Sequence, residues 1–152
     1  MFFFSMTTVF LIALDYLTKH LAWQYLTFRE PVVIIPDILR LVYLKNTGAA
    51  FGLLKGQQFF LAIIAALVLL YIVYYVKREL CINRTQYTSL IFIFAGTAGN
   101  FINRVFAGGV IDFFDLYGKW PIFNLADIFI NIGVFLLIVS IFKYKKPRSK
   151  KQ

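Results

Sequence analysis

The sequence has few of the residues that soluble enzymes and disulfide-bonded domains use most. It contains one cysteine and one histidine in 152 residues. A single cysteine excludes an internal disulfide framework, and these two residues cannot by themselves complete an ordinary zinc site. Charged residues make up only 15% of the chain, and seven of them are acidic. We therefore expect neither a metal nor another cofactor.

Apolar residues, in contrast, are abundant. They make up 61% of the chain, and the mean hydropathy is +0.76. Soluble domains are about 45–50% apolar and about 25% charged. This composition excludes a disordered chain, a collagen-like chain and almost any soluble monomer of this size. It indicates an integral membrane protein that forms a single domain over residues 1–152.

Four apolar stretches are long enough to cross a bilayer. Phe59 to Val76 is an unbroken apolar run of 18 residues, which as a helix would extend for about 27 Å. The N-terminal run lacks the basic start and the cleavage site of a secretory signal, so we assign it as a span. We expect spans at about 3–23, 59–76, 87–105 and 124–142, outer loops at about 28–58 and 106–123, and a basic cytoplasmic tail at 143–152.

The basic residues indicate the orientation of these spans. Nine of the 16 lysines and arginines flank the second, third and fourth spans on one side, and Glu79 is the single acid among them. The remaining seven cations and six acids nearly cancel. Cytoplasmic segments carry such an excess of Lys and Arg. We therefore expect both termini in the cytoplasm. Because no basic stripe alternates with exposed aromatic residues, we expect no nucleic acid partner.

The first outer loop predicts a small β structure. Residues 31–35 and 38–44 are rich in β-branched and bulky side chains, and Pro36-Asp37 separates them as a turn pair. The expected fold is an all-α membrane protein with four transmembrane helices and a small extracytoplasmic β-hairpin that lies on the membrane surface as a cradle.

Several polar residues lie inside the expected spans, where they are costly and by default functional candidates. Asp127 begins the last span, three residues after Asn124 and on the same helical face; the alternative is a first-turn acid that complements the helix dipole. Asn100 and Arg104 share one face of the third span, and a snorkelling arginine is the alternative there. Asp15 and Lys19 have the spacing of a helical ion pair, for which structural pairing is the simpler interpretation.

Outer-side carboxylates offer a chemistry that needs no metal, cysteine or histidine. Two carboxylates at an apolar interface share one proton, because desolvation and repulsion raise one pKa. The ionised member can then activate a water while the protonated member polarises a carbonyl group. Asp112 and Asp127 are the best pair among Asp15, Asp37, Asp112, Asp115 and Asp127. By chemistry alone, Asp115 competes with Asp112.

Five motifs in order resemble those of one family, the lipoprotein signal peptidases, which are the type II signal peptidases of bacteria. They cover nearly the whole chain and run as follows: Asp15-Tyr-Leu-Thr-Lys19, Asn46-Thr-Gly-Ala-Ala-Phe51, Gly99-Asn100-Phe-Ile-Asn-Arg104, Gly109-Val-Ile-Asp112-Phe113 and Phe123-Asn124-Leu-Ala-Asp127. The resemblance favours Asp112 over Asp115.

The resemblance implies a monomeric inner-membrane aspartic endopeptidase. Its substrates would be prolipoproteins whose lipobox Cys already carries a diacylglyceryl group, and it would cut just before that Cys. Membrane lipids would surround it. Asp112 and Asp127 would form the catalytic dyad. The residues that would bind substrate or support the site are Asn46, Gly48, Asn100, Arg104, Asn124, Asp15 and Lys19.

One position departs from the family pattern, and two other functions stay open. Asn103 stands where the family usually has an aspartate before the arginine, so a local ion pair with Arg104 is absent. A small transporter or channel subunit would use intramembrane Asp and Asn to line an ion path, which requires polar positions through the full membrane depth. A structural subunit of a larger complex would use small residues to pack helices.

Overall fold

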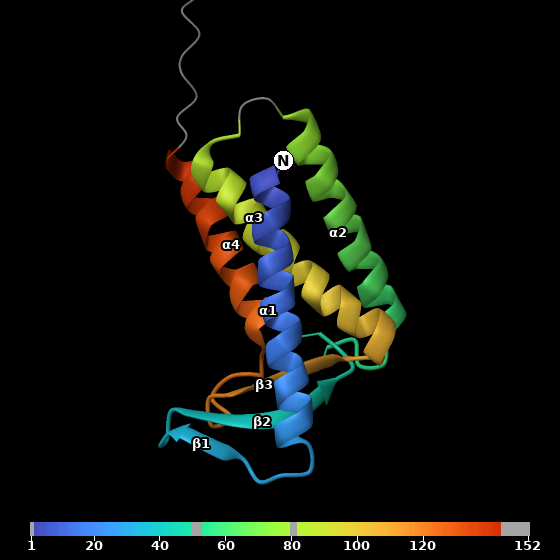
Figure 1. The fold of residues 1–152 in the computed structure, drawn as a ribbon, viewed down its shortest axis with the longest axis vertical. Helices are drawn as coiled ribbons and strands as arrows, with labels where there is room; N and C mark the ends of the chain where they lie inside the picture. The colour runs from blue at the N-terminus through green and yellow to red at the C-terminus, as the bar shows by residue number, and fades with distance from the viewer. Residues whose placement is uncertain (1, 50–52, 80–81, 144–152) are drawn as a thin grey trace, which may run out of the picture.

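The computed structural model describes residues 2–49, 53–79 and 82–143, and contains four long helices with a small sheet at one end (Figure 1). In the described part of the chain, the order is α1 (Phe2–Leu26), β1 (Val32–Ile35), β2 (Leu39–Asn46), α2 (Gln58–Arg78), α3 (Arg84–Ile102), the π-helical turn η2 (Asn103–Ala107), β3 (Val110–Asp115) and α4 (Leu125–Lys143). Ala50 and Phe51 of the second motif, and the basic tail after Lys143, lie outside the described residues.

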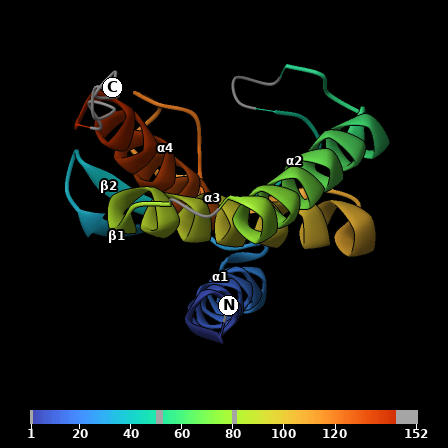
Figure 2. The same cartoon turned by 90° about the horizontal axis from the view of Figure 1, so that it is seen from above.

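All four helices are long and apolar enough to cross a membrane, which confirms the expected fold class. Helix α2 is the most apolar of them and has the smallest buried share within the protein. Helix α3 has the largest buried share, because it packs against α1, α2 and α4 (Figure 2). The helix with the most polar residues near its outer end therefore lies at the centre of the bundle.

Glycines allow α3 and α4 to approach closely. A Cβ at Gly96 would collide with the backbone oxygen of Ala126, and a Cβ at Gly133 would lie 2.8 Å from the backbone oxygen of Ser89. Small residues at a helix interface bring backbones together where lipid supplies no hydrophobic driving force. This contact brings the start of α4 against the outer half of α3.

The sheet is antiparallel with strand order β1-β2-β3. The predicted hairpin is present as β1 and β2, and Asp37 in its turn has a positive φ of 58°. Strand β3, which we did not predict, pairs with β2 and places Asp112 opposite Leu44. Because β3 follows η2 and leads toward α4, it connects the sheet to the outer ends of two helices.

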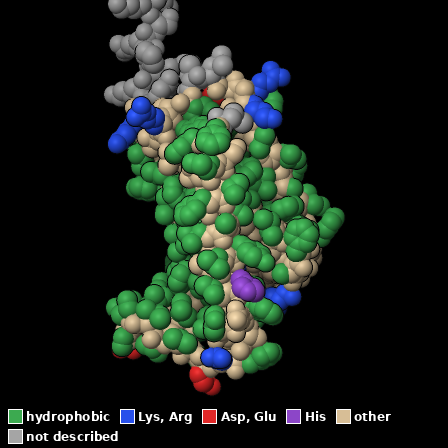
Figure 3. All heavy atoms as spheres, in the orientation of Figure 1, with side chains coloured by type: hydrophobic (Ala, Val, Ile, Leu, Met, Phe, Trp, Pro, Cys, Tyr) green, Lys and Arg blue, Asp and Glu red, His purple; other side chains and the backbone are tan. Residues whose placement is uncertain are grey.

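The protein surface differs between the helical bundle and the end that carries the sheet. On the face that Figure 3 shows, apolar side chains cover the helices, and basic side chains lie at the end away from the sheet as well as near the sheet. Lys77 and Arg78 end α2, Arg84 begins α3 and Lys143 ends α4, so all four lie at that end. Exposed apolar side chains cover the α2 surface, including Phe59 at 80% and Leu70 at 66% exposure. Lipid is the environment that such a continuous apolar surface fits.

Candidate active site

A cavity of about 630 Å³ lies where the sheet meets the outer ends of α3 and α4. Its walls come from the end of β2, from α3 and η2, from β3, from the loop before α4 and from α4 itself. Six of the residues predicted for the site line this cavity: Asn46, Gly48, Asn100, Arg104, Asp112 and Asp127. Residues far apart in the sequence thus share one space that is open to the protein surface.

Asp112 is held in β3 by two amide side chains. Its Oδ2 accepts a hydrogen bond from Asn46 Nδ2 at 2.9 Å, and its Oδ1 accepts one from Asn124 Nδ2 at 2.6 Å. The side chain is only 2% exposed. Burial, together with the nearby charge of Asp127, raises the pKa of Asp112 to about 6, although the two amide hydrogen bonds and the Lys19 charge oppose this rise. Asp112 can therefore hold a proton near neutral pH.

Asp127 belongs to the first turn of α4, where it takes part in a reciprocal cap. Its Oδ2 accepts from the backbone N–H of Asn124 at 3.1 Å, and Asn124 Oδ1 accepts from the backbone N–H of Asp127 at 3.0 Å. This is the geometry of a capping box. The other carboxylate oxygen, Oδ1, accepts from Asn100 Nδ2 at 2.8 Å. Asp127 thus lies in the first turn of α4 and also lines the cavity.

A buried ion pair between Lys19 and Asp15 contacts the residues next to Asp127. Lys19 Nζ lies 2.8 Å from Asp15 Oδ2 and donates to Asn100 Oδ1 at 2.9 Å. Asp15 Oδ1 accepts from the backbone N–H of Ala126 at 2.9 Å. Both charged side chains are 1% exposed, and a Cβ at Gly99 would overlap the Asp15 carboxylate. The predicted ion pair is present, and it ties α1 to α3 and α4.

Asn100 links this ion pair to the cavity. Its carbonyl oxygen accepts from Lys19 and also from Asn124 Nδ2 at 3.3 Å, while its amide nitrogen donates to Asp127. The two acceptor contacts determine which way the carboxamide points. Asn100 therefore presents a donor, and not an acceptor, to the Asp127 carboxylate.

Arg104 lines the cavity one helical turn after Asn100. Its Nη1 donates to the backbone oxygen of Asn100 at 3.4 Å. Its Nε is buried and has no hydrogen-bond partner among the described residues. An unsatisfied buried donor is costly. Arg104 does not snorkel away from the protein.

Gly48 determines the orientation of Asn46. The Gly48 backbone N–H donates to Asn46 Oδ1 at 2.9 Å, which leaves Asn46 Nδ2 to face Asp112. A Cβ at Gly48 would lie 2.6 Å from the Leu53 backbone oxygen. Only a residue without a side chain fits this closed turn, which explains why the loop carries glycine there.

Asp115 lies outside the cavity that contains Asp112. Its Oδ2 is 2.6 Å from Arg40 Nε, and its Oδ1 accepts from the Gly118 backbone N–H at 2.9 Å. Burial alone would raise the pKa of Asp115, but the hydrogen bond from Gly118 and the pairing with Arg40 outweigh it and lower the pKa. Asp115 is therefore a structural anion, and its partner Arg40 had no signal in the local sequence.

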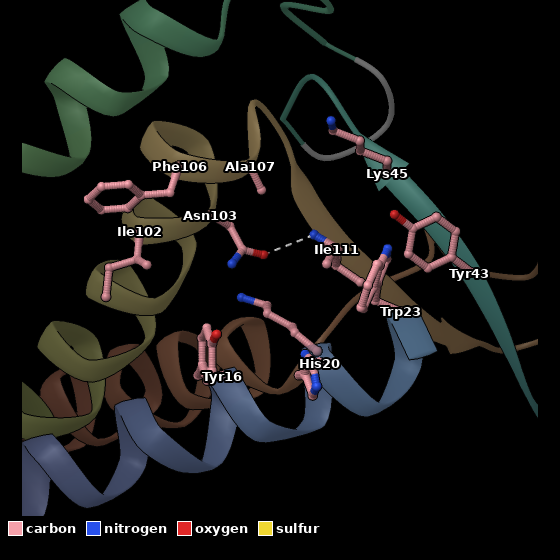
Figure 4. A pocket seen from close by; sticks show the side chains of 11 residues that line it. Tyr16, His20, Trp23, Tyr43, Lys45, Ile102, Asn103, Phe106, Ala107 and Ile111 are labelled. Carbon is pink, nitrogen blue, oxygen red and sulfur yellow. Dashed lines mark hydrogen bonds between the residues drawn. The ribbon is translucent and has the colours of Figure 1, made fainter. Parts of the chain in front are cut away.

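Asn103 and His20 lie on the other side of α3 from this cavity. Figure 4 shows both around a separate cavity of about 350 Å³ between α1, α3 and the sheet. Asn103 Oδ1 accepts from the Ile111 backbone N–H at 3.2 Å, so it connects η2 to β3. His20 is stacked with Tyr16 and also lies beside Trp23. The amide at position 103 thus makes a backbone contact that needs no charge.

Comparison with known proteins identifies the family. A family model described as signal peptidase (SPase) II matches residues 7–143. A lipoprotein signal peptidase of Shouchella clausii is 40% identical over 131 residues, 86% of this chain and 87% of that protein. One of Streptococcus pyogenes is 37% identical over 141 residues, 92% and 93% of the two chains.

Solved structures agree with this assignment. A bacterial membrane enzyme determined by the in meso method at 2.3 Å resolution matches with a TM-score of 0.89 and 32% identity, covering 100% of this chain and 94% of that one. A second, at 1.9 Å, matches with a TM-score of 0.84 and 33% identity, covering 94% of both chains. The chain therefore belongs to the signal peptidase II family, whose activity is the removal of signal peptides from prolipoproteins.

Proposed function

We propose that this protein is an aspartic endopeptidase that cleaves diacylglyceryl-modified prolipoproteins just before the lipidated Cys, with Asp112 and Asp127 as the catalytic dyad. The observation that carries the proposal is the shared cavity, in which both carboxylates are held by amide donors and one has a pKa near 6. A carboxyl group that can hold a proton, with a second carboxyl group in the same cavity, is an arrangement that suits acid–base hydrolysis of an amide.

The hydrogen bonds favour one division of labour within the dyad. Asp112, with its raised pKa, holds the shared proton, and Asp127, which accepts hydrogen bonds from Asn100 Nδ2 and the Asn124 backbone N–H, acts as the general base. Asp127 removes a proton from a water molecule as the water oxygen attacks the scissile carbonyl carbon. Asp112 gives its proton to the carbonyl oxygen, and a tetrahedral diol forms.

Collapse of the diol completes the cleavage. The proton on Asp127 passes to the amide nitrogen, the C–N bond breaks, and Asp112 recovers a proton from the diol. The products are the carboxyl group of the signal peptide and the amino group of the lipidated Cys. Arg104, which lines the cavity with the two carboxylates, would bind a backbone carbonyl of the substrate and hold the peptide across the dyad.

The location of the cavity suits a substrate anchored in lipid. Several of its lining residues come from α3 and α4, which are long and apolar enough to span a membrane. Apolar side chains such as Trp120, Ile130 and Ile132 share the lining with the carboxylates. The peptide can therefore reach the dyad while its acyl chains stay in the bilayer or against this apolar wall.

The basic residues support an orientation with both termini in the cytoplasm. Lys77, Arg78, Arg84 and Lys143 lie at the helix ends away from the sheet, as positive-inside topology requires. The sheet and the dyad would then face the outside of the inner membrane, where the lipidated Cys of a translocated prolipoprotein is found. We propose that the enzyme works there as a monomer.

A cleavage assay tests the proposal. Purified protein in liposomes is given a prolipoprotein with or without the diacylglyceryl group, and the loss of the signal peptide is followed by gel shift. We expect cleavage of the lipidated form only. Asp112→Asn and Asp127→Asn should abolish it, and Asp115→Asn, the matched control three residues away, should retain it. Failure of folded wild-type protein to cut a validated substrate would refute the proposal.

A further inference from the structure

A second groove lies outside the proposed catalytic cavity and is continuous with it. It has a volume of about 710 Å³ and runs between β2 and the 116–123 loop. Four residues line both spaces: Asn46, Trp120, Pro121 and Ile122. We call this space, whose other lining includes Arg40, Lys45, Lys55 and Lys119, the outer groove.

The outer groove belongs to the part of the protein away from the bilayer. None of its lining residues comes from a helix that could span a membrane, whereas Asn100, Arg104 and Asp127 of the catalytic cavity do. A substrate chain that crosses the dyad has one end in the membrane, as the signal peptide, and the other in water, as the mature protein. The outer groove is the path from the dyad toward water.

Positive charge dominates the outer groove. Arg40 and Asp115 neutralise each other at 2.6 Å. Lys119 Nζ donates to the Asp37 backbone oxygen at 3.0 Å, which positions the ammonium without cancelling its charge. Lys45 and Lys55 are exposed, and within the described residues neither has an ion-pair partner.

The position of Lys45 is partly determined by its surroundings. Its stem crosses Gly109, where a Cβ would lie 3.1 Å from Lys45 Cγ. The following residue, Asn46, donates to Asp112. Lys45 therefore precedes a residue that contacts Asp112, and it lines both the outer groove and the separate cavity shown in Figure 4.

We propose that the outer groove binds the first residues of the mature lipoprotein after the lipidated Cys and selects substrates with acidic side chains there. This inference rests on the proposed function. Three uncompensated lysines attract carboxylates and repel lysine or arginine at the same substrate positions. Because exposed ion pairs contribute modestly, two or three of them should change kcat/KM by about threefold to tenfold.

Matched substrates test this proposal. Three diacylglyceryl-modified peptides share one sequence up to and including the Cys and then carry glutamate, glutamine or lysine at the next positions. Wild-type protein in vesicles of neutral lipid should cleave them with kcat/KM in the order glutamate, glutamine, lysine. The double variant Lys45→Gln/Lys55→Gln should reduce the ratio of the glutamate to the lysine peptide by about threefold or more. Arg29→Gln, a control that removes an exposed cation outside the groove, should leave this ratio unchanged.

Measurements at different ionic strengths and in vesicles of different lipid composition distinguish the selection of acidic substrates from the binding of lipid headgroups. The preference should shrink as salt rises from about 0.1 M to about 1 M, where the Debye length falls from about 10 Å to about 3 Å. Equal cleavage of the three peptides, or a preference that the double variant keeps, would overturn the inference while leaving the peptidase proposal intact. If the double variant slows all three peptides equally, and only in vesicles of anionic lipid, the groove binds lipid headgroups and the inference is wrong. Absence of cleavage of every peptide would instead refute the proposed function.

Discussion

The raised pKa of Asp112 predicts how the stability of this protein depends on pH. The pKa rises from 3.8 to about 6 on folding, and the side chain is 2% exposed. One pKa unit corresponds to about 1.4 kcal/mol, so ionising Asp112 costs about 3 kcal/mol more in the folded protein than in the unfolded chain. The stabilising contribution of protonated Asp112 is fully present below pH 3.8 and is lost as the pH rises through 6.

The effect of Asp112 ionisation on the free energy of unfolding is large enough to measure. Between about pH 4.5 and about pH 8, the loss from this one group is about 2 kcal/mol in the free energy of unfolding. For a chain of this length, that difference lowers the melting temperature by about 4–8 °C. Asp112→Asn has no carboxyl group to ionise, so its melting temperature should change by that much less over the same range.

Thermal unfolding of purified protein in detergent, followed at a series of pH values, provides the measurement. Asp115→Asn is the control, because the pKa of Asp115 is lowered below 3.8. The stability that Asp115 supplies is present above pH 3.8 and lost only at lower pH. That variant should therefore melt parallel to wild type across the measured range. If Asp112→Asn also ran parallel to wild type, the raised pKa of Asp112 would be wrong.

Three further predictions concern the neighbours of the dyad. Asn46→Ala removes a hydrogen bond that lowers the pKa of Asp112, so the alkaline limb of kcat/KM against pH should move up by about 0.5–1 unit; an unmoved or lowered limb would contradict this. Lys19→Met leaves Asp15 charged and buried, which should cost about 3–5 kcal/mol in unfolding experiments, and adding Asp15→Asn should recover much of it; no recovery would argue against the pair as the cause. Gly96→Ala forces a methyl group into the backbone of α4 and should lower the free energy of unfolding by about 1–3 kcal/mol, whereas a neutral effect would mean that the helices can separate without cost.

The sequence alone was sufficient to predict the membrane fold. A bilayer demands long apolar helices whose backbone groups are satisfied internally, and that demand leaves a strong signal in runs such as Phe59 to Val76. The β1–β2 hairpin was predictable for a similar local reason, because bulky residues flank a Pro-Asp turn. The motifs indicated the family, and the comparisons confirmed it.

The site was predictable as a set of residues but not as an arrangement. Asp112 and Asp115 lie in one short strand and have the same chemistry. Only the tertiary structure places the first beside Asn46 and Asn124 and the second beside Arg40. Strand β3 had no distinct local signal, because its pairing with β2 joins residues about seventy positions apart.

Local sequence thus determined which segments enter the membrane, while long-range packing determined which carboxylate can hold a proton. Hydrophobicity and helix length are properties of neighbouring residues, so they can be read along the chain. A pKa depends on burial and on the partners within a few ångströms. For Asp112 those partners come from the end of β2 and from the residue before α4, and only the tertiary structure brings them together.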